Sequence, residues 1–233
     1  MSNAHRYGFR FVRSLSGNDT PQTFTFPIAS GYAPNTIDGG GGTSVNLNIG
    51  DPVRIRQDGT IRLVQTGQDT TGANTANPDY AFGVIAGFPR MSVNGFIRPS
   101  SFYTSGTTYS GGIGGDAAPV ALVIPVANNI FEVDSDAVLG TLTRSGALGL
   151  VGQTTKIAYS VLTVGTGQPK ANPLLSISGL STDGSVQNQL VIVGVGATDQ
   201  DQDYTATNVT FQVMFSAQQL EIVNAAGVFG AAN

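Results

Sequence analysis

The residues best suited to bind a cation are alternating carboxylates late in the chain. Asp199, Asp201 and Asp203 stand in the stretch DQDQD at the spacing that begins a calcium-binding loop. The rest of that loop does not follow, because Tyr204 stands where the loop needs glycine and Thr210 where it needs a bidentate glutamate. We therefore expect solvated carboxylates after a strand, with a weak calcium site as the alternative.

A second group of acids has the residue types of a glycosidase. Glu132, Asp134 and Asp136 alternate along one predicted strand, so they point the same way and no carboxylate faces them across a cleft. His5 is the only histidine and there is no cysteine, which nearly excludes a Ser–His nucleophile or a His-rich zinc site. The sequence predicts neither an enzyme nor a bound cofactor.

Arginine brings a third kind of chemistry, because its planar fork of donors binds carboxylates through paired hydrogen bonds. Two short stretches hold six of the eleven basic residues, namely Arg6, Arg10, Arg13, Arg54, Arg56 and Arg62. Like charges opposite one another on a sheet are unfavourable unless something compensates them. We expect these arginines to form an interface with an acidic partner, either another protein or the acid-rich second half of a neighbouring copy. Solvation of the arginine heads is the alternative.

The second arginine stretch, residues 51–64, reads as a hairpin around Asp58-Gly59. A two-residue loop would place Arg56 opposite Ile61 and mix charge with hydrocarbon on each face. A three-residue loop, 57–59 with Gly59 in the left-handed conformation, leaves one face wholly apolar. That register pairs Val53 with Leu63, Arg54 with Arg62, and Ile55 with Ile61. Because register follows the buried face, we expect the three-residue loop.

The elements that must carry these residues are strands. Apolar and polar residues alternate with period two, and turn-forming residues separate the runs at short intervals. The predicted strands and hairpin lie at 23–28, 51–64, 80–88, 119–126, 130–136, 156–164, 174–180, 189–197 and 208–216. Only 216–226 resembles a helix. We predict an all-β fold, either a β-barrel or a β-sandwich.

Glycine-rich stretches suggest how the chain divides. The segment 106–119 is flexible in composition and coincides with a change of charge, since residues 1–98 hold eight arginines against six acids and residues 99–233 hold three basic residues against nine acids. We predict two small β subdomains, 49–110 and 118–233. Residues 1–48 are predicted to be either an extended N-terminal arm or the first strands.

The bulk composition narrows the class of protein. Charged residues are only 11% of the chain and its formal net charge is −4, too little positive charge for a nucleic-acid binder. The start lacks the apolar region of a signal peptide, and no apolar run is long enough to span a membrane. Without cysteine, the chain is compatible with folding in a reducing cytoplasm. We expect no nucleic-acid or membrane partner.

Several stretches in a fixed order resemble a known family. They are PIASGYAPN, LNIGDPVRIRQDGTIRLV, AFGVIAGF, YTSGTTYSGG, PVALVIPVANNIFEVDSD and NVTFQVMFSAQQL, which together extend over residues 26–220. This order resembles the head decoration, or cement, proteins of tailed bacteriophages. The resemblance implies synthesis in the host cytoplasm and a place on the capsid exterior of the virion, bound to the major capsid protein and bridging capsomers. It transfers no catalytic residue.

Self-association is part of the same expectation. A subunit that contacts several capsomers gains avidity, and closed symmetry suggests a homotrimer on a local threefold axis, with a dimer on a twofold as the alternative. Another virion structural protein, such as a tail, fibre or baseplate component with a carbohydrate-binding tip, is the alternative function.

Overall fold

The computed structural model describes most of the chain between residues 8 and 216. The described residues are 8–28, 45–56, 58–64, 80–93, 96–104, 119–137, 143–162, 170–182, 188–196, 202–205 and 208–216. Everything below concerns these residues. The predicted helix at 216–226 lies outside them except for its first residue.

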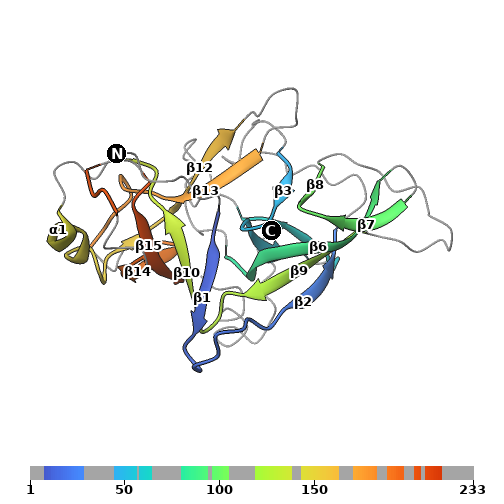
Figure 1. Ribbon diagram of the computed structural model, residues 1–233, viewed down its shortest axis with the longest axis horizontal. Coiled ribbons are helices and arrows are strands. Elements are labelled where there is room, and N and C mark those ends of the chain that lie inside the picture. Colours follow the sequence, from blue (N-terminus) through green and yellow to red (C-terminus); the bar gives the residue numbers. More distant parts are fainter. Residues whose placement is uncertain are drawn as a thin grey trace.

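The prediction of an all-β fold is confirmed, because one five-residue helix stands among many strands (Figure 1). The strands are β1 (Arg10–Ser14), β2 (Phe24–Pro27), β3 (Leu47–Asn48), β4 (Pro52–Ile55), β5 (Ile61–Leu63), β6 (Gly83–Val93), β7 (Phe96–Ser100), β8 (Phe102–Tyr103), β9 (Val120–Pro125), β10 (Asn129–Asp134), β11 (Thr154–Thr155), β12 (Ile157–Leu162), β13 (Lys170–Leu175), β14 (Leu190–Val195) and β15 (Thr210–Phe215). The helix, α1 (Arg144–Leu148), begins at Thr143, whose side chain accepts a hydrogen bond from the Gly146 N–H.

Two larger antiparallel sheets form the body of the molecule. One has five strands in the order β1-β10-β15-β14-β11, and the other has six, in the order β2-β9-β6-β4-β5 with β7 paired to β6. Figure 1 shows the first sheet at the left and the second at the right. The pairs β12–β13 and β3–β8 form small two-stranded sheets. None of these sheets closes on itself within the described residues, so the fold is sandwich-like rather than a barrel.

Strand β15 illustrates how the alternation of the sequence builds a sheet with one buried face. Phe211, Val213 and Phe215 are fully buried, whereas Gln212 and Met214 between them are half-buried. Side chains on a strand point alternately to its two faces, so the aromatic and aliphatic residues share the core side. The strand predicted at 208–216 is therefore present, with the expected polarity.

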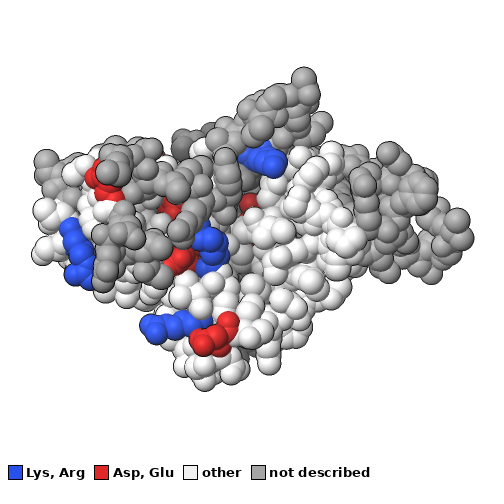
Figure 2. All heavy atoms as spheres, in the orientation of Figure 1, with Lys and Arg blue, Asp and Glu red and all other residues white. Residues whose placement is uncertain are grey.

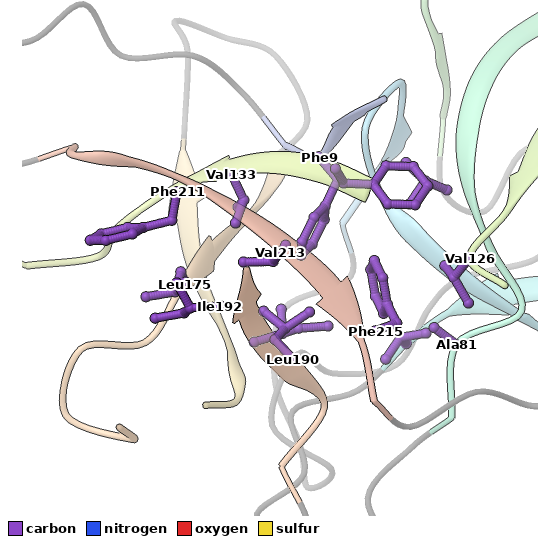
Figure 3. Close-up of a cluster of buried hydrophobic side chains, with 14 of the residues drawn as sticks. Phe9, Ala81, Val126, Val133, Leu175, Leu190, Ile192, Phe211, Val213 and Phe215 are labelled. Carbon is purple, nitrogen blue, oxygen red and sulfur yellow. The ribbon is translucent and has the colours of Figure 1, made fainter. Parts of the chain in front are cut away.

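The core joins the two larger sheets. Phe215 packs against Phe131, with ring centroids 5.7 Å apart, and against Phe9 at 4.9 Å. Val84 and Ile124, from the six-stranded sheet, belong to the same buried cluster. Figure 3 shows Phe215 of this cluster beside Ala81 and Val126, which flank strands of the six-stranded sheet. The alternate residues of the six-stranded sheet enter a second cluster on its other face, so that sheet is packed on both sides.

The predicted subdomain limits do not coincide with the sheets. Strand β9 lies beyond the predicted boundary at 106–119, yet it pairs with β2 and β6 in the six-stranded sheet. After β1, the chain returns to the five-stranded sheet only beyond β9, through residues 126–128. A glycine-rich composition marks a connection, but strand pairing depends on long-range contacts that composition does not encode.

The first 48 residues contribute strands to both sheets. Strand β1 pairs with β10, and β2 pairs with β9. Phe9 and Ile28 are buried in separate core clusters. The sequence left two alternatives for this stretch, an extended arm or the first strands. The described residues 8–28 form strands of the two sheets and not an extended arm.

Candidate functional site

The β4–β5 hairpin has the three-residue register that the sequence predicts. Val53 pairs with Leu63, Arg54 with Arg62, and Ile55 with Ile61. Around the loop, the Arg56 N–H donates to the Thr60 carbonyl at 2.8 Å and the Gly59 N–H donates to the Arg56 carbonyl at 3.1 Å. Gly59 has φ +77°, the left-handed conformation that the turn requires. Val53, Ile61 and Leu63 form the buried face.

The tip of the hairpin holds its own counter-charge. Asp58 Oδ1 accepts hydrogen bonds from the Thr60 N–H at 3.0 Å and the Thr60 hydroxyl at 2.6 Å. Asp58 Oδ2 lies 3.5 Å from Arg56 Nη1, and both side chains are largely exposed. The Thr60 hydroxyl and N–H, followed by the Arg56 charge, lower the pKa of Asp58. Arg56 is thus positioned at an exposed tip by a carboxylate that stays ionised.

Arg54 and Arg62 lie opposite one another on the other face of the hairpin. Both are half-buried. Val64 follows Arg62 on the same face of the chain, and its side chain is fully buried in the cluster shared by the two larger sheets. The two arginines therefore lie on the face of the six-stranded sheet that turns toward the five-stranded sheet, close to the core rather than at the exposed tip.

Another arginine, Arg10, lies in the five-stranded sheet near acids of the same chain. Arg10 Nη2 is 3.7 Å from Glu132 Oε2 and 3.6 Å from Asp134 Oδ1. Asp134 is fully buried and accepts a hydrogen bond from the Thr210 hydroxyl at 2.9 Å. Figure 2 shows basic and acidic side chains in contact near the middle of the molecule, within a surface that carries few charges.

The expectation that the alternating acids point the same way holds for two of the three. Glu132 and Asp134 share one face of β10 and both approach Arg10. Asp136 turns away to accept a hydrogen bond from the Ile177 N–H at 2.9 Å. The arrangement pairs buried carboxylates with a guanidinium, which suits holding β1 to β10. Arg13 is exposed on β1, and Arg6 lies outside the described residues.

The candidate calcium loop is described only in part. Asp203 accepts hydrogen bonds from the N–H of Thr205 at 3.0 Å and from its hydroxyl at 2.6 Å, which lower the pKa of this carboxyl. Asp199, Asp201 and His5 lie outside the described residues. Within the described ranges, no three His, Cys, Asp or Glu side chains gather closely enough to hold a metal ion.

Asp51 is a buried carboxyl whose burial the sequence pattern does not predict. Asp51 is 1% exposed, and its Oδ2 accepts a hydrogen bond from the Asn48 N–H at 2.8 Å. Burial raises the pKa of Asp51 well above its ordinary value. Its position in Gly-Asp-Pro predicts a turn, but nothing in the local sequence indicates that the turn is covered.

The turn is covered by the N-terminal segment. Gly8 and Gly50 both have positive φ, and the Phe9 N–H donates to the Gly50 carbonyl at 2.9 Å. A Cβ on Gly8 would stand 2.8 Å from the Gly50 oxygen, so only glycine permits this approach.

Comparison with models of protein families, with curated proteins and with solved structures finds no significant match to this chain. No helix within the described residues is long and apolar enough to cross a membrane.

Proposed function

We propose that this protein is a structural component of a phage virion, which binds the outside of an assembled capsid and stabilises it by bridging capsomers. The order of stretches that resembles the cement proteins supports this role, and so does the all-β fold with its low content of charge. The partner is the major capsid protein, and the bound form is a homotrimer on a local threefold axis or a dimer on a twofold.

The observation that carries the proposal is the geometry of the β4–β5 hairpin, which belongs to one of the resembling stretches. Its exposed tip holds Arg56 with a side chain that is 42% exposed, oriented by the locked carboxylate of Asp58. A positioned guanidinium at an exposed turn is suited to bind acidic groups on another protein surface.

The test of the proposed function is co-sedimentation with assembled capsid shells. The protein should pellet with shells and stay in the supernatant with unassembled capsid subunits, because bridging requires neighbouring capsomers. Arg56→Ser should weaken shell binding by about tenfold at low salt and reduce its dependence on salt. Arg144→Ser, at an exposed arginine of α1, is the matched control and should bind like the wild type. Equal binding to shells and to free subunits would contradict the proposal.

A further inference from the structure

Strand β2 is an edge of the six-stranded sheet as the described strands form it. Among the described residues it pairs only with β9. The Ile28 N–H donates to the Pro119 carbonyl at 2.9 Å. This bond shows which residues of β2 direct their backbone N–H and C=O toward β9, namely Ile28 and, by alternation, Phe26 and Phe24. Because backbone groups of successive residues point to opposite sides of an antiparallel strand, the N–H and C=O of Thr25 and the C=O of Pro27 point away from β9. Thr25 is exposed.

The same strand exposes an aromatic side chain. Phe24 is 50% exposed, whereas Phe26, two residues along on the same face, packs against Phe82 with ring centroids 5.0 Å apart. Figure 1 shows β2 at the outer margin of its sheet. Free edges with apolar side chains are sites where proteins add a strand from another chain, and natural proteins commonly block them.

We infer that β2 pairs antiparallel with β2 of a second copy about a twofold axis through Thr25. Each Thr25 N–H then donates to the Thr25 carbonyl of the other copy, and each Thr23 N–H donates to the Pro27 carbonyl of the other copy. Phe24 of one copy stands opposite Phe26 of the other, twice by symmetry. The exposed ring of Phe24 is thereby buried in a cross-strand aromatic pair.

The sequence of β2 selects this register. An axis through Phe26 would pair the two Phe26 rings but leave the exposed Phe24 opposite Ile28. An axis through Phe24 would pair the two Phe24 rings but leave Phe26 opposite Gln22. Only the axis through Thr25 gives both aromatic residues an aromatic partner. In this register Pro27 has no N–H to donate to the Thr23 carbonyl of the other copy, but its own carbonyl still accepts from Thr23, so the pairing is short but not blocked.

This interface stands independently of the proposed capsid role, since it requires only two copies of the chain. It favours the twofold dimer over the homotrimer, because an isologous contact between two identical edges closes on itself.

The first test is sedimentation velocity over a wide range of protein concentration. The wild type should pass from monomer to dimer. Thr25→Pro removes the outward N–H and leaves the ladder with β9 intact, so it should raise the dimer dissociation constant by at least roughly tenfold while the melting temperature stays near that of the wild type. Leu148→Ser, at a comparably exposed apolar residue of α1, should dimerise like the wild type.

The second test fixes the register by crosslinking. The chain has no cysteine, so a single introduced thiol reports one contact. Thr25→Cys should form an intermolecular disulfide under mild oxidation, because directly paired residues at a twofold lie within disulfide range. Thr20→Cys, on the exposed connection between β1 and β2, should not. A wild type that stays monomeric at every concentration, or equal crosslinking of the two cysteine variants, would overturn the inference.

Discussion

The β4–β5 hairpin and the N-terminal strand β1 each carry an arginine paired with carboxylates of the same chain, but the carboxylates come from different places in the sequence. In the hairpin, Arg56 finds its acid two residues away, at Asp58. In β1, Arg10 finds Glu132 and Asp134 on a strand more than a hundred residues along the chain. The hairpin is a local structure set by turn chemistry, and β1 is held by the rest of the molecule. We therefore expect substitutions around β1 to lower the unfolding free energy more than substitutions at the tip of the hairpin.

The largest difference is expected between two phenylalanines of the N-terminal segment. Phe9 is 3% exposed and packs on Phe215, so Phe9→Ala should cost about 3–5 kcal/mol of unfolding free energy. Phe24→Ala, fifteen residues on, should change the unfolding free energy by less than about 0.5 kcal/mol at protein concentrations where the chain is a monomer, because the Phe24 ring is then exposed. Chemical denaturation measures both. A small effect of Phe9→Ala would show that the N-terminal segment is a detachable arm after all.

The two regions also contain matched glycines with positive φ. Gly59, in the hairpin, has open space where a Cβ would point, so Gly59→Ala should cost only the strain of a left-handed residue, about 1–2 kcal/mol. Gly8, before β1, would bring its Cβ against the Gly50 backbone, so Gly8→Ala should cost more than Gly59→Ala. Equal losses in denaturation experiments would mean that the crossing of Gly8 and Gly50 is loose.

A pH series distinguishes the buried turn from the exposed one. Burial raises the pKa of Asp51 in the folded state, so its contribution to stability is fully present below the ordinary value of 3.8 and is lost as pH rises through the folded pKa. Asp51→Asn keeps an acceptor for the Asn48 N–H and removes this loss. The variant should therefore gain stability relative to the wild type as pH rises above about 4. Parallel curves of unfolding free energy against pH would contradict the assignment.

The hairpin is a part of the structure that could be predicted from the sequence. Asp58-Gly59, flanked by alternating apolar residues, sufficed to predict the register, the left-handed glycine and the pairing of Arg54 with Arg62. The strand at 208–216 could be predicted equally well, because apolar and polar residues alternate regularly along it. In the hairpin the decisive contacts lie close together in the sequence. In β15 the alternation marks the buried face, although the strands it pairs with, β10 and β14, lie farther away along the chain.

The remaining features depend on contacts between distant segments. The sequence indicated that Glu132 and Asp134 share a face, but not that Arg10 meets them, because nothing local specifies that β1 pairs with β10. For the same reason the predicted boundary separates β9 from the sheet in which it pairs with β2 and β6, and Asp51 was recognised as a turn residue but not as a buried one. Such pairings follow from packing the whole chain around one core.

The smallest effect is expected at the exposed end of the hairpin. Arg56 and Asp58 form an ion pair of 3.5 Å in which both side chains are largely exposed, so Arg56→Met should lower the unfolding free energy by no more than about 0–1 kcal/mol. Arg10→Met breaks ion pairs of nearly the same length, 3.6 and 3.7 Å, but with carboxylates that are almost entirely buried. Its loss should be about 1–3 kcal/mol, because water cannot replace the missing charge at Asp134. Denaturation of both variants at low and high salt measures the contrast, and raising the salt should diminish the effect of Arg56→Met more than that of Arg10→Met. If the two losses were equal, the distance between charges would matter more than their burial, and the N-terminal strand would be no more firmly held than the tip of the hairpin.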